Sequence, residues 1–226
     1  MTYFDTLETR SDDQRANDLA VALPAQIALA QTAVGYAGSL ADVDATAITS
    51  PSDLAALPVL RKSDLSKAQG GNAPFGGFTV KPASGFAHIF QSPGPIYEPG
   101  GVDHDWWRMG RFLHAVGIGQ GDVVQNCFGY HLTPAGMIFE NGARAVGAAV
   151  LPAGTGQTEL QVTAARDVGA TAYAGTPDYL KVILDRADSM GIKLGFTKAA
   201  VGGGALFPSL RQEYADRGIT CLQSYA

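Results

Sequence analysis

The chain has 226 residues, 46% of them hydrophobic and 16% charged, and this balance fits a compact globular protein and excludes a disordered one. Aspartate and glutamate total 21 against 16 lysines and arginines, for a formal net charge of -5; because no basic cluster stands out, we expect no nucleic-acid partner. The N-terminus is acidic and polar, unlike a secretory signal, and no stretch approaches the ~20 apolar residues of a membrane span, so we expect a soluble, cytoplasmic protein with no membrane partner.

The N-terminal part of the chain carries helical patterns separated by loops. Residues 12–37 are rich in Ala and Leu and predict two helical pieces that are broken at Pro24, because proline lacks the amide that a helix interior needs. A linker rich in Ala, Ser, Pro and Asp follows. In the segment LPVLRKSDLSKA, residues 57–68, Ser63 can cap a short helix that starts at Asp64.

From residue 86 onward, short apolar β-type runs alternate with helical patterns. This alternation predicts an α/β fold, a mostly parallel sheet flanked by helices, and the N-terminal patterns predict a helical preface packed on it. We therefore expect two parts, residues 1–85 and 86–226. The predicted strands are 86–90, 122–128, 148–152, 170–175, 197–202 and 219–224. The predicted helices are 103–116, 134–146, 157–167, 176–190 and 207–217.

The helix predicted at 103–116 has the clearest pattern. Asp103 is the expected cap, and an apolar stripe follows on one helical face. We expect this stripe to pack in the core and not to bind a ligand. It consists of Trp106, Met109, Leu113 and Val116.

Many of the 28 glycines fall where the predicted strands end, which is the edge where open α/β sheets bind ligands. Of the loops there, FGYHLTPAG (128–136) supplies aromatic rings, an imidazole and a helix start. Those groups suit a flat organic acid, but His131 is equally compatible with a half-buried structural role. Read alone, GGGAL (202–206) is a flexible turn, and helix capping explains TPDYL (176–180).

The two cysteines, Cys127 and Cys221, lie far apart in the sequence, each in an apolar run. This setting predicts buried, reduced thiols. No CxxC or Cys/His spacing indicates zinc, so we expect no metal site made of protein ligands.

Seven segments, in order and at matching spacing, resemble the phenylacetate-CoA ligase-like branch of the adenylate-forming enzymes. The resemblance runs from about Leu54 to Ala226. The segments are LAALPVLRKSDL, APFGGFTV, GIGQGDVVQNCFGYHLTPAG, LPAGTGQTELQV, TPDYL, GGGALF and the terminal QSYA.

The resemblance implies a function as well as a fold. Enzymes of this family activate a carboxylic acid with ATP and Mg²⁺ and pass it to coenzyme A, so it implies a small aromatic or apolar acid as substrate. It places the acyl pocket at Phe128, Gly129, Tyr130, His131, Ala153, Gly154 and Thr155. It places the adenine side at Gly203, Gly204, Ala205 and Tyr225, and the phosphates near Ser92 and Gly94. We predict no catalytic general base, because a carboxylate is already ionised at neutral pH.

The loop QSPGPIYEP, residues 91–99, departs from the family's phosphate loop. Pro93 and Pro95 remove amide donors, and Glu98 stands where a lysine would offset phosphate charge. These changes weaken phosphate binding. The alternative to a ligase is therefore a non-catalytic relative that keeps the acid pocket. An unrelated nucleotide-binding protein is disfavoured because no GxxxxGK[ST] occurs and no GxGxxG follows a strand.

The sequence stops inside the motif that begins at Tyr225, before the groups that complete catalysis in the family. We therefore expect a truncated N-terminal portion, inactive by itself. Apolar surface left uncovered by such a truncation predicts a homo-oligomer.

Overall fold

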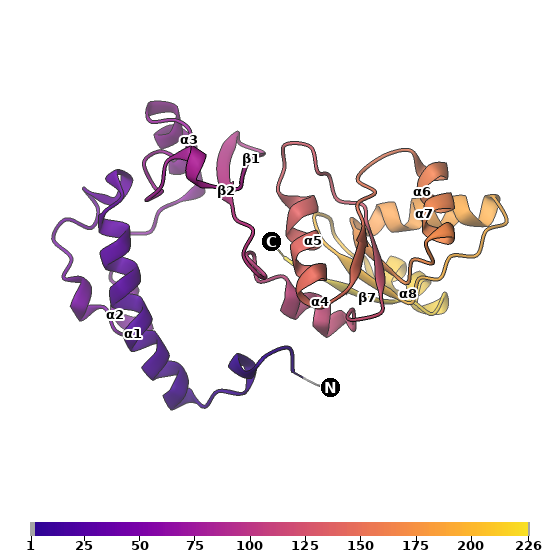
Figure 1. Ribbon diagram of the computed structural model, residues 1–226, viewed down its shortest axis with the longest axis horizontal. Helices are drawn as coiled ribbons and strands as arrows, with labels where there is room; N and C mark the ends of the chain where they lie inside the picture. The colour runs from indigo at the N-terminus through magenta and orange to yellow at the C-terminus, as the bar shows by residue number, and fades with distance from the viewer. Residues whose placement is uncertain (1–2, 226) are drawn as a thin grey trace. The chain divides into compact units, whose positions relative to one another are not determined.

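The structure is a computed structural model that describes residues 3–225. It contains two compact units, one that runs to Gly101 and one that begins at Val102 (Figure 1). Within residues 3–225, no helix is both long and apolar enough to cross a membrane.

The N-terminal unit is built around one long helix, α1, Asp12–Gln31. Figure 1 shows this helix in indigo. Ser11 and Gln14 form a capping box at its start. The predicted break at Pro24 is wrong, because α1 continues through this proline. A proline removes one helical hydrogen bond, and tertiary contacts hold the second half of the helix: Gln31 Nε2 donates to the carbonyls of Leu40 and Val43 at 2.9 and 2.8 Å.

Short helices fill most of the rest of this unit. The predicted cap at Ser63 is wrong, since α3 starts at Lys62 and Arg61 precedes it without a side-chain capping bond. The helix therefore starts two residues earlier than the serine pattern indicates. The elements are η1 Thr6–Thr9, η2 Val34–Tyr36, η3 Ala45–Ala47, α2 Pro51–Leu54, α3 Lys62–Gly71 and η4 Ala83–Gly85.

An antiparallel hairpin completes the N-terminal unit. Its strands are β1, His88–Ser92, and β2, Ile96–Gly100. The predicted strand at 86–90 is therefore shifted, and its placement in the parallel sheet is wrong. Buried Gln69 ties the hairpin to α3, because its side chain accepts from the Tyr97 amide and donates to the Tyr97 carbonyl, both at 2.8 Å. For this reason the compact unit extends beyond the expected boundary at residue 85.

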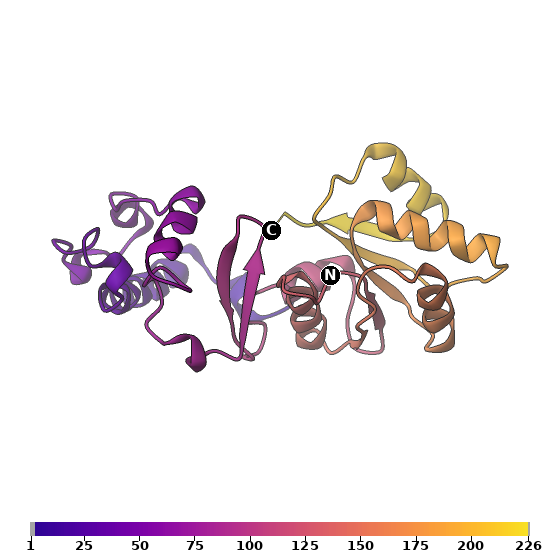
Figure 2. The same ribbon diagram turned by 90° about the horizontal axis from the view of Figure 1, so that it is seen from above.

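The C-terminal unit contains a five-stranded parallel sheet in the order β4-β3-β5-β6-β7, with helices on both faces (Figure 2). The predicted α/β class is confirmed. The strands are β3 Val123–Asn126, β4 Ala149–Leu151, β5 Ala172–Gly175, β6 Lys198–Val201 and β7 Thr220–Gln223. The helices are α4 Gly110–Val116, α5 Ala135–Ala145, α6 Thr158–Asp167, α7 Pro177–Ser189 and α8 Pro208–Asp216.

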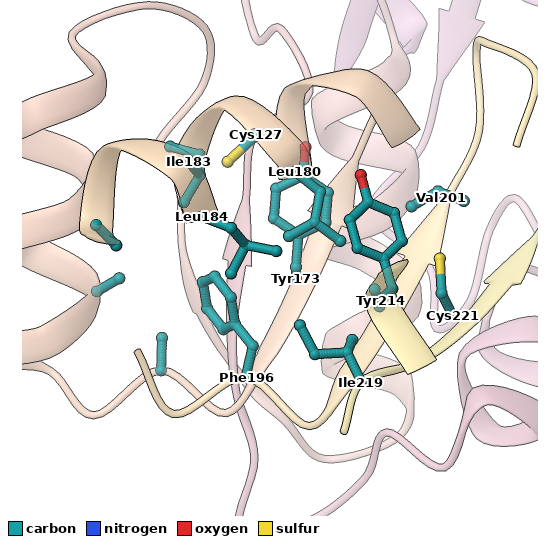
Figure 3. Packing of buried hydrophobic residues seen from close by; sticks show 14 of the residues in the cluster. Cys127, Tyr173, Leu180, Ile183, Leu184, Phe196, Val201, Tyr214, Ile219 and Cys221 are labelled. Atoms are coloured by element: carbon teal, nitrogen blue, oxygen red, sulfur yellow. The ribbon is translucent and has the colours of Figure 1, made fainter. Parts of the chain in front are cut away.

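Alternation along each strand divides the core into two layers. In β5, Tyr173 packs with residues of α6, α7 and α8, whereas Ala172 and Ala174 pack with residues of α4 and α5. Figure 3 shows the first layer, in which Tyr173 and Tyr214 point their hydroxyl groups the same way. Tyr173 donates to the carbonyl of Thr176 at 3.0 Å and Tyr214 donates to that of Pro177. These buried tyrosines therefore anchor the start of α7.

The predicted helix at 103–116 is only half right. Helix α4 begins at Gly110, because Asp105 and Arg108 adopt left-handed φ values of 49° and 57° that interrupt a helix. The Asp105 carboxylate, and not Asp103, accepts from the Gly110 amide at 2.9 Å. Trp106 is 40% exposed and lies outside the core. The remainder of the predicted stripe is buried as expected: Met109, Leu113 and Val116.

Candidate functional site

The order of the parallel strands singles out one edge of the sheet. The chain continues from β3 to β4 on one side of β3 and then crosses to β5 on the other side. In open α/β sheets, ligands bind outside the carboxyl ends of the strands at such a switch point. We call the loops that leave this end the carboxyl edge. It comprises residues 127–134, 152–157, 176–177 and 202–206.

A buried asparagine shapes the loop after β3. Asn126 is 0% exposed, and its Nδ2 donates to Tyr130 Oη and to the Gly136 carbonyl, both at 2.8 Å. Its Oδ1 accepts from the Phe128 amide at 3.2 Å. The Phe128 ring stacks on that of Phe139, with centroids 4.2 Å apart. Asn126 therefore positions residues of the predicted acyl pocket, although the sequence analysis assigned it no role.

The predicted acyl-pocket residues differ in exposure. Phe128 is buried, Gly129 and Tyr130 are half-buried, and His131 is exposed. Burial raises the pKa of Tyr130, and the charge of Glu140 raises it further, so the phenol keeps its proton.

The second group of acyl-pocket residues lies in the loop after β4. Ala153 and Gly154 are half-buried and Thr155 is exposed. The Gly154 amide donates to the Asn126 carbonyl at 2.9 Å, which joins this loop to the end of β3. The structure thus brings both groups to the carboxyl edge.

The predicted adenine loop reaches the same edge. Gly203 has a left-handed φ of 69°, and a Cβ added to it would lie 3.7 Å from atoms of Phe128 and Thr176. Gln223 holds the rest of the loop: its Nε2 donates to the Gly204 carbonyl at 2.7 Å and its Oε1 accepts from the Leu206 amide at 3.2 Å. This bracing leaves the Gly203–Ala205 backbone exposed.

The last predicted member of the adenine side follows β7. Tyr225 is fully exposed, and the preceding amide, that of Ser224, donates to the Val201 carbonyl at 2.9 Å. The start of the QSYA segment is therefore tied to the end of β6, next to the glycine loop. Ala226 lies outside the described residues.

Ser92 and Gly94, predicted near the phosphates, lie on the hairpin of the N-terminal unit. The buried Ser92 hydroxyl donates to the Glu98 carboxylate, so it is already engaged within the hairpin. Pro93 and Pro95 carry no amide hydrogen, and residues 88–100 contain no lysine or arginine. This hairpin does not fit a triphosphate, which needs free donors and positive charge.

Asp122 forms a GD pair with Gly121 in the segment GIGQGDVVQNCFGYHLTPAG of the resemblance, and it lies at the opposite end of the sheet from the carboxyl edge. Its carboxylate accepts from Lys198 Nζ at 2.7 and 2.9 Å, Thr171 Oγ1 at 2.8 Å and the Gly119 amide at 2.9 Å. Burial alone raises the pKa of Asp122, but these hydrogen bonds, led by that from Lys198, outweigh it and lower the pKa from its ordinary value. The GD pair is therefore structural.

Both cysteines are free and buried, as predicted. Burial raises the pKa of Cys127 to about 12 and that of Cys221 to about 11. At neutral pH both thiols are therefore protonated and poor nucleophiles. Among residues 3–225, no group of three or more His, Cys, Asp or Glu side chains is placed to hold a metal ion.

Comparisons with known proteins support the resemblance. No family model matches the chain. It is 34% identical over 162 residues to phenylacetate-coenzyme A ligase of Aromatoleum evansii, a match that covers 69% of this chain and 36% of that protein. It is 31% identical over 189 residues to the ligase of the same name from Pseudomonas putida, with 79% and 42% covered. The chain thus spans less than half the length of these curated relatives.

The fold is similar to that of a solved acyl-CoA ligase. An open conformation of 2-hydroxyisobutyryl-CoA ligase, in complex with 2-HIB-AMP and CoA, superposes with a TM-score of 0.83 at 20% identity. The match covers 93% of this chain and 49% of that one. A postadenylation state of the same ligase gives a TM-score of 0.82. At 20% sequence identity, this structural similarity shows a shared fold.

Proposed function

We propose that this chain, which belongs to the phenylacetate-CoA ligase-like branch of the adenylate-forming superfamily, is the N-terminal part of an ATP-dependent aryl- or acyl-CoA ligase-like enzyme and binds its carboxylic acid. One observation carries the proposal. The loops predicted for the acid and for the adenine converge at the switch point of the parallel sheet, where Gly203 lies against Phe128.

The chemistry of the carboxyl edge supports an aromatic or apolar acid. Phe128 and Tyr130 supply rings, and the loop after β4 supplies mostly small residues and exposed backbone. An ionised carboxylate needs no general base to become a nucleophile. The contribution of this chain is then to hold and orient the acid, a task for which rigid positioning matters most.

The other substrates follow from the family. ATP, when bound with Mg²⁺, supplies the group that activates the acid, and coenzyme A supplies the thiol that accepts the acyl group. The exposed Gly203–Ala205 backbone, braced by Gln223, suits a flat ring such as adenine. The hairpin does not suit the phosphates, so we derive no step through them.

The engaged hairpin favours a second candidate function. If Ser92 stays bonded to Glu98, the chain keeps the acid site but lacks a working phosphate-binding loop. This combination is expected of a non-catalytic relative that binds an acid. Persistence of a fold does not preserve its activity.

Calorimetric titration of this chain tests both functions. We expect phenylacetate to bind saturably and 2-phenylethanol, which lacks the carboxylate, to bind much more weakly. No heat from any acid of an aryl and alkyl panel, with tryptophan fluorescence showing a folded protein, would overturn the proposal. Mg²⁺-ATP is titrated in parallel: acid binding without nucleotide binding supports the second candidate, and binding of both supports the ligase.

We also propose that the chain forms a homo-oligomer. The N-terminal unit exposes Val21, Val34 and Val59 by 77%, 76% and 78%, and a second copy of the chain would cover such apolar side chains. Light scattering after size-exclusion chromatography tests this. A monomer at both low and high salt would contradict it.

A further inference from the structure

The loop after β4 has an unusual backbone. Gly154, Gly156 and Gln157 all have left-handed φ values, 65°, 79° and 49°. Glycine adopts this conformation readily, but for glutamine it is unfavourable and persists only when surrounding groups hold it. The loop therefore needs bonds from outside itself.

One side chain supplies most of them. Gln161, on α6, is 4% exposed, and its Nε2 donates to the carbonyls of Gly154 and Gly156 at 3.0 and 2.7 Å. Its Oε1 accepts from Gln125 Nε2 at 2.8 Å and from Cys127 Sγ at 3.1 Å. The amide thus joins the loop after β4 to the end of β3 through a buried network.

Only a side-chain amide can fill this position. The side chain at this position must donate two hydrogen bonds to loop carbonyls and, with its other atom, accept two hydrogen bonds from Gln125 and Cys127. A carboxylate of the same shape accepts but does not donate, and would face two carbonyl oxygens. A methionine of similar size makes neither bond and leaves buried polar groups unsatisfied.

A second contact on the loop comes from the exposed side. Tyr179 Oη donates to the Gly156 carbonyl at 3.0 Å. The Gly156 carbonyl therefore accepts hydrogen bonds from both the buried amide of Gln161 and the phenol of Tyr179. Of these two side chains, Gln161 is the one that donates to the Gly154 carbonyl.

We propose that Gln161 is a positioning residue that sets the conformation of residues 153–157 and, through it, the affinity of the carboxyl edge for the acid. The first part stands on the hydrogen bonds alone. The second part rests on the proposed function. The thiol of Cys127 acts here as a hydrogen-bond donor to Gln161 and not as a nucleophile.

The test compares two buried glutamines whose side chains each donate to backbone carbonyls. Gln161→Glu removes both donors from the loop, and Gln69→Glu removes the one donor that a similarly buried glutamine gives to Tyr97 in the other unit. Amide hydrogen exchange is measured across residues 153–157 without ligand. We expect exchange about tenfold or more faster in Gln161→Glu, from the loss of two buried hydrogen bonds, and no change there in Gln69→Glu. Unchanged exchange in Gln161→Glu, or equal acceleration in both, would overturn the proposal.

A second readout separates positioning from stability. We expect the dissociation constant for phenylacetate to rise about tenfold in Gln161→Glu but not in Gln69→Glu. Lowering the pH should restore part of this affinity, because a protonated glutamic acid again donates one hydrogen bond. If the unmodified chain binds no acid, the proposed function fails while the exchange experiment still decides the role of Gln161.

A milder variant keeps the proposal testable if Gln161→Glu fails to fold. Tyr179→Phe removes one bond to Gly156 at a partly exposed site, so the fold should survive. We expect exchange in residues 153–157 to rise by about threefold, less than in Gln161→Glu. A larger effect from Tyr179→Phe than from Gln161→Glu would assign the positioning role to the phenol instead.

Discussion

The hairpin of the N-terminal unit and the carboxyl edge of the parallel sheet use their polar groups in opposite ways. In the hairpin, Ser92 and Glu98 bond to one another, so the groups that a phosphate would need are engaged. At the carboxyl edge, Asn126, Gln161 and Gln223 brace the loops from buried or neighbouring positions and leave glycine backbone exposed. Whether a loop can bind a ligand therefore depends on which partners its polar groups already have.

The largest effect should come from the core beneath the carboxyl edge. Tyr173→Ala removes a fully buried ring and a bond to Thr176, and should lower the free energy of unfolding of the C-terminal unit by about 4 kcal/mol. Trp106 and Trp107 both lie in this unit, so denaturant unfolding followed by tryptophan fluorescence measures the loss. Hydrogen exchange in α1 should not change. Equal loss of protection in both units would show that they unfold as one.

A smaller loss should follow from the ion pair at the other end of the sheet. Asp122→Asn leaves Lys198, whose side chain is 28% exposed, without its anion, and should lower the free energy of unfolding by about 2 to 3 kcal/mol at pH 7. Because the folded-state pKa of Asp122 is lowered from 3.8, this stabilisation is complete above that value and is lost as the pH falls through the folded pKa.

The pH dependence supplies the check on that ion pair. Chemical denaturation at several pH values should show wild type and Asp122→Asn converging below about pH 4. Asp44 also has a lowered pKa, from its bond to Thr46, but it is exposed in the N-terminal unit, so Asp44→Asn should shift the midpoint far less. A difference between wild type and Asp122→Asn that stays constant with pH would contradict this assignment.

The hairpin can be tested by a gain of binding. Glu98→Lys removes the acceptor of the Ser92 hydroxyl and adds a positive charge, so the affinity for Mg²⁺-ATP should rise by about tenfold, about 1.4 kcal/mol. Calorimetry measures the change. In the double variant with Ser92→Ala, part of the gain should disappear. No gain in the single variant would show that the Ser92 bond does not limit phosphate binding.

The smallest effects belong to the surface ion pairs of both units. Arg10 pairs with Asp18 and Lys181 pairs with Asp185 and Glu213, all at least partly exposed. Arg10→Ala should change the free energy of unfolding by less than about 0.5 kcal/mol, and Lys181→Met should change it little, because solvent screens exposed ion pairs. Thermal unfolding in low and high salt checks both. A loss above 2 kcal/mol would mean that these pairs are structural in the way that Asp122 is.

Much of the sheet could be predicted from the sequence, because strands buried on both faces, such as β5, appear as short continuous apolar runs, whereas helices place apolar residues every three or four positions. The predicted strand at 170–175 and the helix after it correspond to β5 and α7. Two of the failures, at Pro24 and in the hairpin, occurred where other residues decided the local structure. Gln31 helps hold α1 together beyond Pro24, and Gln69 binds the hairpin to α3.

The candidate site was predicted in the same uneven way. The resemblance assigned roles to Phe128 and Gly203, whereas Asn126 and Gln161 received none, although they lie in two of the same segments. A signal existed for both: Gln125 and Asn126 are amides within an apolar strand, and Gln161 lies on the buried face of an amphipathic helix. Buried amides imply partners, although the sequence does not identify them.

The sequence by itself determined the α/β class, the order of the segments and the family, because these depend on local periodicity and on motifs that are contiguous in the chain. Only the tertiary structure decided which polar groups are engaged: Ser92 with Glu98, and Gln161 with the loop after β4. A hydrogen bond depends on a few tenths of an ångström and on the direction of each donor. That geometry arises only when segments far apart in the chain pack together.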